Sequence, residues 1–595
     1  MKKYKVIFQP EGKKVSALPG VTIAALAAQH GVRLEVPCGA VGKCGKCRIE
    51  VSKGAGVAAP DSEEKALLSK KELARGIRLA CRAKVSGDAV ISIPRSSRLQ
   101  TQKILDVGIQ TEVKLAPAVK KIYFKTSPEV ENLPFKFSGT VEDLKKSTAV
   151  YLSEEKQLLT VETGDTTGVL YGMAFDVGTT TVVGSLVELT TGIVKATAAD
   201  MNPQVVYGDD VISRLNFCME NKHGLSELNK KIIVVINKLI KEVCEEADIK
   251  PESVYDVVLC GNTTMEHFLL KADPKPLAVY PFVSALAQSM NKKKAVDFGI
   301  NVNTKASVAV FPVIGGWVGG DTLGVILATN LYKTSHIKVA IDIGTNGEVV
   351  LGNKDRLVTA SCAAGPAFEG AHIRSGMRAS KGAVEKIDLV DGKIVCQTIE
   401  NAAPVGFCGS GLIDAMAFLV EQGIVEDTGR IKDKNELPGE LPAELKENLI
   451  EHENGNEFIF AGSASGNISL NQKDVREIQL AKGAMLAGIE ILMRELGIKA
   501  GEISEVLLAG AFGNYIRAEK ALAIGLIPQV ELKKIIFCGN AAEEGARKAL
   551  LSVDLRKEVE EIAKFTKYVD LSASPLFQEI FAESMMFQKK RIEKQ

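Results

Sequence analysis

The chain has 595 residues, of which 46% are hydrophobic and 25% charged, a composition typical of globular proteins and long enough for three or four domains. No apolar run reaches the roughly 18 residues that a membrane span needs, and the N-terminus lacks an apolar signal core. We therefore expect a cytoplasmic protein with no membrane partner. Eleven cysteines in such a chain favour metal, redox or buried thiols over a disulfide framework.

The charge is spread unevenly along the chain. Residues 1–95 hold 18 Lys and Arg against 8 Asp and Glu, a net charge of +10, whereas the whole chain carries +1. No RNA- or DNA-binding motif accompanies this basic segment, so a nucleic-acid partner is not expected. The excess of positive charge is either an ordinary solvated surface or a docking face for an acidic redox partner.

Four cysteines in the first hundred residues follow a C-x5-C-x2-C spacing, with a fourth after another 33 residues. A Gly-rich loop with three thiolates and a distant fourth is what a [2Fe–2S] cluster requires, since its N–H groups donate to the cluster sulfurs. A zinc ribbon is the alternative, but zinc ribbons favour two C-x2-C pairs and this segment has one. The predicted cluster ligands are Cys38, Cys44, Cys47 and Cys81.

The residues around these cysteines predict a β-grasp ferredoxin-like domain over residues 1–95. Strands are expected at 4–8 and 14–17, a helix at 23–29, and a closing strand at 90–93. The x5 gap resembles the vertebrate and bacterial variant of the plant-type ferredoxins.

The next seventy residues carry little functional signal. Residues 96–110 are polar without periodicity and are predicted to be a linker. Residues 111–170 combine a strand-like VKKIYFKT with a helix-like VEDLKKS, which predicts a small α/β domain that acts as a spacer or docking module.

Two similar stretches, AFDVGTTTVVGSLVE at 174–188 and AIDIGTNGEVVLG at 340–352, organise the rest of the chain. Each predicts a buried strand, an Asp, a tight Gly-Thr turn and a second strand, with hydroxyl and N–H groups facing an anion. The repeat predicts a duplicated fold that closes on a polyphosphate. Asp176 and Asp342 then need a divalent cation, because like charges would otherwise repel the ligand. The GxxxxGK[ST] pattern of a P-loop is absent.

Further Gly-rich segments follow the first hairpin. They are GNTT at 261–264, GGWVGGD at 315–321, SCAAGPAFEGAHIRSGM at 361–377, GFCGSGLIDAMAFL at 406–419 and EVLLAGAFGNYI at 505–516. GNTT and GSG are equally compatible with ligand contacts and with plain turns or helix N-caps. Asp321 either orients an attacking water or caps the helix expected after it.

Together these segments resemble the superfamily of acetate and sugar kinases, heat-shock ATPases and actin. The resemblance implies that residues 171–595 form two RNase H-like subdomains that clamp Mg–ATP between them, with Asp176, Asp342 and Asp321 as catalytic residues. The implied phosphate 1 loop comprises Asp176, Gly178, Thr179 and Thr180. The implied phosphate 2 loop comprises Asp342, Gly344, Thr345, Asn346 and Gly347. The implied adenosine loop comprises Gly510, Ala511, Phe512 and Gly513.

The fusion of a ferredoxin to such an ATPase resembles one family from end to end, the reductive activators of corrinoid proteins. The motifs include PCGAVGKCGKC, RLACRAKV, both hairpins, LAGAFGNY and the terminal SPLFQEIFAESMMF. The resemblance implies ATP-dependent one-electron reduction of Co(II) to Co(I) in a methyltransferase or O-demethylase system. Its implied partners are a corrinoid protein and a low-potential electron donor; homodimers are common in the family. The residues themselves do not determine the oligomeric state.

Three alternatives stay open at this point. A phosphotransferase acting on a small carboxylate or sugar shares the ATPase fold but leaves the cluster without a purpose. An activator of a dehydratase also drives an uphill electron, but it holds its cluster by cysteines of the ATPase itself, which this chain lacks. A non-catalytic scaffold is the third. Within SCAAGP, Ser361 is either a partner-facing hydroxyl that ligates Co(II) weakly or a structural serine at a strand end.

Overall fold

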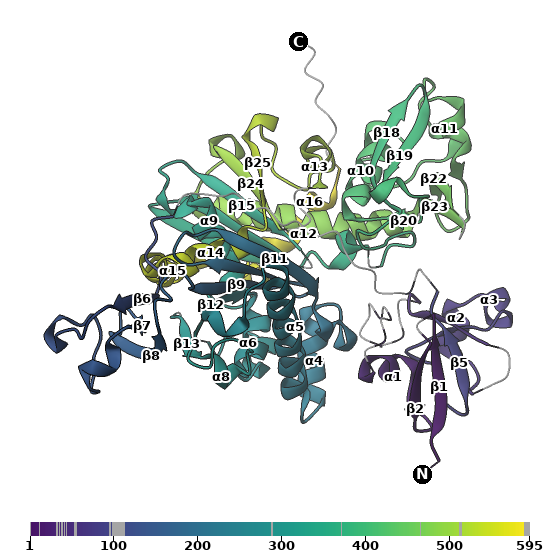
Figure 1. Cartoon of the computed structure of the whole chain (residues 1–595). Coiled ribbons are helices and arrows are strands. Elements are labelled where there is room, and N and C mark those ends of the chain that lie inside the picture. The colour runs from purple at the N-terminus through teal and green to yellow at the C-terminus, as the bar shows by residue number, and fades with distance from the viewer. Residues whose placement is uncertain are drawn as a thin grey trace.

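The protein is described by a computed structural model over residues 2–587, apart from 11, 31, 33, 35, 37–39, 41, 43–44, 53–55, 95–96, 98–112, 287–288, 345, 371, 464–465 and 511–514. Its described residues form two six-stranded sheets, one five-stranded sheet and three three-stranded sheets, joined by helices. Figure 1 shows an N-terminal lobe and a small lobe that flank a large α/β body. This arrangement confirms the predicted multidomain α/β class.

The N-terminal lobe is a mixed five-stranded sheet in the order β2-β1-β5-β3-β4. Its alternating apolar residues, such as Val6, Phe8 and Ile91, form a fully buried core against α1. The predicted strands and helix are confirmed to within one residue. The elements are β1 (Tyr4–Gln9), β2 (Lys13–Ala17), α1 (Ile23–Gln29), β3 (Arg48–Val51), α2 (Ser62–Leu67), α3 (Lys70–Ala74), β4 (Ile77–Leu79) and β5 (Ala89–Ser92).

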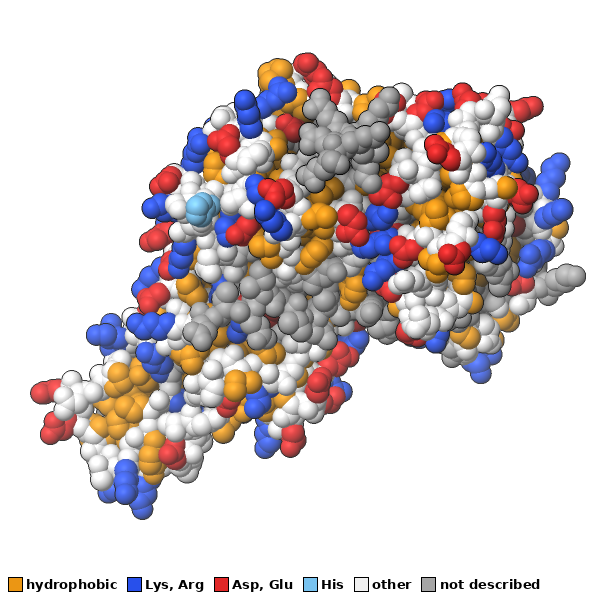
Figure 2. All heavy atoms as spheres, turned by 90° about the horizontal axis from the view of Figure 1, so that it is seen from above, with side chains coloured by type: hydrophobic (Ala, Val, Ile, Leu, Met, Phe, Trp, Pro, Cys, Tyr) orange, Lys and Arg blue, Asp and Glu red, His pale blue; other side chains and the backbone are white. Residues whose placement is uncertain are grey.

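The small lobe is an antiparallel sheet of β6 (Val119–Phe124), β7 (Ser147–Leu152) and β8 (Gln157–Thr163). It projects from the body, and hydrophobic side chains gather on its surface at the lower left of Figure 2. The prediction of a helix in VEDLKKS is wrong, because the chain makes only a 3₁₀ turn at Val141–Leu144. Lys146 then adopts a φ of +54°, and β7 begins at the next residue. The predicted linker lies outside the described residues except for Ser97.

The body is built from two six-stranded sheets with the same central plan. In each sheet a hairpin forms the centre, and the first strand of the hairpin pairs in parallel with a strand from later in the chain. The first sheet comprises β9 (Tyr171–Val177), β10 (Thr181–Glu188), β11 (Val194–Met201), β12 (Val254–Gly261), β13 (Asn291–Lys294) and β14 (Ser307–Val310). The second comprises β15 (Lys338–Ile343), β16 (Gly347–Asn353), β17 (Arg356–Cys362), β24 (Glu505–Ala509), β25 (Ile535–Gly539) and β26 (Lys567–Tyr568).

Helices join the two sheets into one unit. A single hydrophobic cluster includes buried residues of both sheets, such as Val258 and Leu507, with side chains of α9 and α14 between them. These two helices cross at glycines, since a Cβ on Gly324 would lie 2.6 Å from the Ala542 carbonyl oxygen. The helices of the body are α4 (Val211–Glu220), α5 (Gly224–Glu246), α6 (Thr263–Leu270), α7 (Lys275–Ala278), α8 (Ala295–Phe298), α9 (Gly320–Thr329), α12 (Gln472–Leu496), α13 (Ala518–Ile524), α14 (Ala541–Leu551), α15 (Val553–Phe565) and α16 (Phe577–Met585).

An additional α/β segment lies between β17 and α12. Its two small sheets flank α10, which is buried along most of its length. The elements are β18 (Ala383–Val390), β19 (Lys393–Thr398), β20 (Gly406–Phe407), α10 (Gly409–Glu421), α11 (Ala443–Glu447), β21 (Leu449–Ile450), β22 (Glu457–Ser463) and β23 (Gly466–Asn471). None of the helices in the described part of the chain has the length and apolar character that a bilayer crossing requires.

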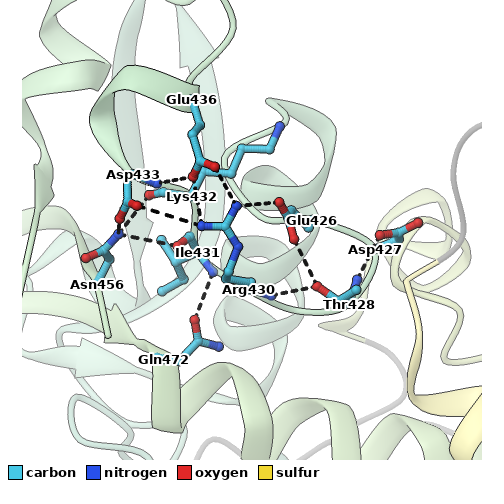
Figure 3. A network of polar contacts seen from close by, with 10 residues as sticks. All are labelled: Glu426, Asp427, Thr428, Arg430, Ile431, Lys432, Asp433, Glu436, Asn456 and Gln472. Atoms are coloured by element: carbon cyan, nitrogen blue, oxygen red, sulfur yellow. Dashed lines mark hydrogen bonds and ion pairs between the residues drawn. The ribbon is translucent and has the colours of Figure 1, made fainter. Parts of the chain in front are cut away.

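A network of polar contacts fixes the loop that follows α10 (Figure 3). Arg430 donates to Glu426 at 2.6 Å and to both carboxylate oxygens of Glu436 at 2.7 and 2.9 Å. The backbone N–H of Ile431 donates to Gln472 at the start of α12 over 2.9 Å. The Arg430 guanidinium already has carboxylate partners and is partly exposed, so we assign the network to loop structure rather than to ligand binding.

Candidate functional site

A cavity of about 230 Å³ lies where the two hairpins of the body face one another. It is far larger than the space that one water needs, and it brings together residues from both six-stranded sheets and the additional segment. Of the predicted nucleotide residues, those that line it are Asp176, Gly178, Thr179, Thr180, Asp321, Asp342, Gly344, Asn346 and Gly510. The two stretches that are distant in sequence therefore do form one site.

The first hairpin turn is held by side chains that approach it from behind. Arg214 Nη2 donates to the Thr179 carbonyl oxygen at 2.7 Å, and Asn202 Nδ2 donates to the Gly178 carbonyl oxygen at 2.9 Å. Asn262 Nδ2 donates to Thr179 Oγ1 at 2.9 Å. Because these contacts fix the carbonyls on the far side, the turn is held rigid at the edge of the cavity, as an anion site requires.

Arg214 is completely buried in α4. Burial lowers the pKa of its guanidinium to about 10, which still leaves it charged at neutral pH. The positive charge of this buried side chain lies next to the first turn, so its field makes the potential at the turn more positive, which favours a bound anion. The sequence offered no signal for this residue, because it lies 38 positions from Asp176.

The two glycines of the second turn have different surroundings: Gly344 lines the cavity, whereas Gly347 packs against α12. Gly344 and Asn346 line the cavity, and the Gly344 N–H donates to the Asn346 carbonyl oxygen at 3.1 Å. Gly347 does not line the cavity; a Cβ there would lie 1.7 Å from Met485 Sδ, so α12 is what requires glycine at this position. Thr345 lies outside the described residues.

Three aspartates gather in the cavity, and among the described residues no cationic side chain is one of the groups that shift their pKa values. Burial, followed by repulsion from Asp321, raises the pKa of Asp342 to about 7. Burial raises the pKa of Asp321 to about 6, and burial together with both neighbouring aspartates raises that of Asp176 well above its ordinary value. Such a cluster suits a bound divalent cation, which would favour the ionised forms.

The carboxylates do not form a complete metal site by themselves. Among the described residues, no group of three or more His, Cys, Asp or Glu side chains is arranged to hold a metal ion. This agrees with Mg²⁺ chemistry at nucleotide sites, where the ion keeps several waters and takes its remaining ligands from one or two carboxylates and from phosphates. The residues present therefore fit a cation that arrives with a nucleotide.

Asp321 lies in the first turn of α9, but Gly319 is the N-cap residue of that helix. The Asp321 Oδ1 accepts from the N–H of the adjacent Thr322 at 2.6 Å, and the side chain lines the cavity. The geometry thus assigns it to the site as well as to the helix start. Its role toward water stays a prediction.

Gly510 is the one residue of the predicted adenosine loop that the structure describes. Its φ is +88°, and a Cβ on it would lie 2.4 Å from Asp342 Oδ1. The glycine therefore leaves space for the carboxylate of Asp342 on β15, the neighbouring strand of the same sheet. Ala511, Phe512 and Gly513 lie outside the described residues.

Two of the four predicted cluster ligands are described. Cys47 and Cys81 are buried, and their Sγ atoms lie 3.3 Å apart, too far for a disulfide and close enough to bind one metal atom. Cys38 and Cys44 lie outside the described residues, so the four-thiolate set stays a prediction.

The structure adds lining residues that the sequence did not single out. Glu348 and Glu369 reach the cavity from β16 and from the loop after β17, while Asn540, the N-cap of α14, hydrogen-bonds Asp176 and lowers its pKa. GSG and GNTT, which the sequence left open between ligand contacts and helix caps, both supply residues at the cavity. Ser410 of GSG lines the cavity at the start of α10, and Asn262 of GNTT caps α6 while it contacts the first turn.

Ser361 lies near the end of β17 and is half-buried. Its Oγ donates to Glu348 Oε1 at 3.3 Å, which places it one residue behind the cavity wall rather than in the lining. A contact with cobalt stays a prediction.

The fold and the site define a class: a two-part nucleotide-binding body of the acetate and sugar kinase, heat-shock ATPase and actin type, preceded by a ferredoxin-like lobe. Family comparisons agree, matching "2Fe-2S iron-sulfur cluster binding domain" at residues 6–86, "RACo middle region" at 171–334 and "C-terminal domain of RACo the ASKHA domain" at 336–595. The chain belongs to the family of reductive activators of corrinoid proteins.

Whole-chain relatives support this assignment. The corrinoid activation enzyme RamQ of Eubacterium limosum is 31% identical, with 98% of this chain and 99% of RamQ aligned. The [Co(II) methylated amine-specific corrinoid protein] reductase of Methanosarcina barkeri is 29% identical over 66% of this chain and 72% of that protein. The solved structure of a "Reductive activator for corrinoid,iron-sulfur protein" is 32% identical, covers 98% of each chain and superposes with a TM-score of 0.71.

Proposed function

We propose that the protein restores Co(I) in a corrinoid protein of a methyltransferase or O-demethylase system. It passes one electron from a [2Fe–2S] centre to Co(II) and couples this transfer to ATP hydrolysis. The observation that carries the proposal is the joint presence of a ferredoxin lobe and a nucleotide cavity in a chain similar over its full length to corrinoid activators.

The energetics explain why a nucleotide is needed. Plant-type clusters have potentials near about −400 mV, and the Co(II)/Co(I) couple is expected to be lower. For one electron a tenfold change in equilibrium is about 59 mV, so a gap of about 200 mV costs roughly 4.6 kcal/mol. A protein meets such a cost when nucleotide turnover changes which redox state of the complex it binds better.

Different residues of the cavity bind different parts of Mg–ATP. The backbone of the two turns, with the Thr179 and Thr180 hydroxyls, receives the phosphates, and Asp176 and Asp342 hold Mg²⁺ through its water shell. Asp321 orients the attacking water. The residues of Gly510–Gly513 border the adenosine. When bound, the cluster supplies electrons one at a time, and Cys38, Cys44, Cys47 and Cys81 hold it.

The remaining assignments are part of the same proposal. The protein acts in the cytoplasm, receives electrons from a low-potential donor and forms a homodimer. Domain boundaries follow residues 95, 110 and 170. Ser361 contacts the corrinoid partner, and unchanged ATP-dependent Co(I) formation in Ser361→Ala would refute that contact.

The test is a visible spectrum of the holoprotein with a Co(II) corrinoid protein, a reductant and Mg–ATP. Co(I) is expected with ATP and not without it, and Asp176→Ala is expected to lose the effect with its cluster absorbance intact. Corrinoid reduction by a variant that no longer binds nucleotide would favour a scaffold. Formation of a phosphorylated acceptor in place of Co(I) would favour a phosphotransferase.

A further inference from the structure

A lysine next to a cluster cysteine connects the ferredoxin lobe to the body. Lys46 directly precedes Cys47, and its Nζ donates to the Gly370 carbonyl oxygen at 2.5 Å and to the Gly376 carbonyl oxygen at 3.4 Å. The acceptors lie more than 320 residues away in sequence, and Gly376 forms a β-bridge with Phe407 of β20, the strand labelled in Figure 1. The loop that carries a cluster ligand is thus attached to the body through a flexible cation, which also interacts with the Asp474 carboxylate. In addition, α1 of the same lobe contacts Pro203–Tyr207 of the body.

The two acceptor carbonyls converge because their loop folds back on itself. A Cβ on Gly376 would lie 2.3 Å from the Gly370 carbonyl oxygen, and one on Gly370 would lie 2.5 Å from the Met377 N atom. Only glycines allow this approach, which leaves both carbonyls facing the same ammonium group. We call the described residues 365–370 and 372–379 the coupling loop.

The other side of the coupling loop faces the nucleotide cavity. Glu369 Oε2 accepts from Thr180 Oγ1, in the first hairpin turn, at 3.0 Å. Residues of the loop that line the cavity are Phe368, Glu369, Met377, Arg378 and Ala379. One short segment therefore contacts the ferredoxin lobe at Gly370 and the predicted phosphate site at the adjacent residue, Glu369.

A bound triphosphate is expected to compete with Glu369 for the Thr180 hydroxyl. Thr180 is expected to donate its hydroxyl to a phosphate oxygen, which removes the donor that holds the Glu369 carboxylate. The same carboxylate would then face several negative charges inside a cavity that already holds three aspartates. The anchors further along remain, because the Arg374 N–H donates to Asp474 Oδ1 at 2.8 Å away from the cavity. Displacement is thus expected at the Glu369–Gly370 end.

We propose that the coupling loop is a nucleotide-responsive docking site for the ferredoxin lobe, with Lys46 as the residue that positions the cluster on it. The loop holds the lobe through Lys46 while Thr180 holds Glu369. ATP displaces Glu369, moves Gly370 and releases Lys46 from it. The role of this release in electron delivery rests on the proposed function, whereas the linkage between nucleotide and docking does not.

The primary test compares Lys46→Met with Lys65→Met in the full holoprotein. Lys65 is an exposed lysine of α2 in the same lobe, so the control removes the same charge without touching the body. Binding of Mg–AMPPNP is measured by calorimetry. Linkage is reciprocal, so loss of docking is expected to tighten nucleotide binding about fivefold in Lys46→Met, with no change in Lys65→Met. Equal affinities in all three proteins would overturn the proposal.

Hydrogen exchange gives a readout that a merely structural lysine would not move. In the wild type, Mg–AMPPNP is expected to accelerate amide exchange in residues 46–52 and 370–377. In Lys46→Met exchange at 46–52 is expected to be fast from the start and insensitive to nucleotide. Glu369→Gln keeps the shape of the side chain and removes its charge. In this variant Mg–AMPPNP is expected to accelerate exchange at residues 46–52 less than in the wild type, because the phosphates no longer repel the side chain. A full nucleotide response at 46–52 in both variants would contradict the proposal.

Exchange and Co(I) formation, measured on the same wild-type protein, distinguish failure of the docking linkage from failure of the proposed function. If the wild type shows the exchange response but forms no Co(I) with ATP, the docking linkage stands and the corrinoid function fails. If Co(I) forms with ATP while residues 46–52 never respond to nucleotide, the function stands and the docking linkage fails.

Discussion

Asp342→Asn should stabilise the nucleotide-free protein while it removes nucleotide binding. Asp342 lies half-buried in the cavity near Asp321, and burial together with repulsion from Asp321 raises its pKa from its ordinary 3.8 to about 7. At about 1.36 kcal/mol per pKa unit, the ionised carboxylate destabilises the folded state by about 4 kcal/mol. Asparagine has nearly the same shape and carries no charge, so this penalty disappears in the variant.

The sign of the effect sets the pH window. Between pH 3.8 and about 7 the folded protein holds a proton on Asp342 that the unfolded chain has lost, so wild-type stability falls as pH rises. Above about pH 7 the penalty is complete. Asp342→Asn should therefore unfold at a temperature several degrees higher than the wild type at pH 8, with a difference that vanishes near pH 4.

The assay is calorimetric unfolding of the holoprotein at pH 5, 6, 7 and 8, with and without Mg–AMPPNP. Mg–AMPPNP should raise the unfolding temperature of the wild type and leave that of the variant unchanged, because the variant lacks a carboxylate for the cation. A variant less stable than the wild type at pH 8 would refute the argument that the ionised Asp342 carboxylate destabilises the fold. A variant still stabilised by nucleotide would refute the assignment of Asp342 as a ligand of the cation.

Three further predictions follow from single contacts. Gly510→Ala should abolish AMPPNP binding in calorimetry, because its Cβ would displace the Asp342 carboxylate, whereas Gly501→Ala, with open space around it, should bind normally. Arg214→Met should weaken AMPPNP binding and lower the free energy of unfolding by about 3–5 kcal/mol in urea, since buried carbonyls such as that of Thr179 lose their donor. Lys482 is buried, which lowers its pKa to about 7, so wild-type stability should rise between pH 7 and 10.5. Lys482→Met should be more stable by up to about 5 kcal/mol below pH 7, and its stability in urea titrations should rise less steeply over that range than that of the wild type.

Local patterns were enough to predict the elements that carry the site. Each Asp-Gly-Thr stretch encodes its own hairpin, because alternating apolar residues form two strands and a glycine allows the tight turn. The cysteine spacing and the short strands around it predicted the ferredoxin lobe in the same way. The same reasoning failed at 141–144, where helix propensity in a short acidic segment was overridden by the pairing of β7.

The two Asp-Gly-Thr stretches by themselves therefore predicted turns suited to an anion, and their repetition indicated a shared cavity. Tertiary structure decided the rest. Arg214, Asn202 and Glu369 reach the first turn from distant elements, and no spacing rule connects them to Asp176. The pKa values depend on how many carboxylates folding buries together. The contact of Lys46 with the coupling loop arises only when two lobes pack against each other, which short-range sequence patterns do not encode.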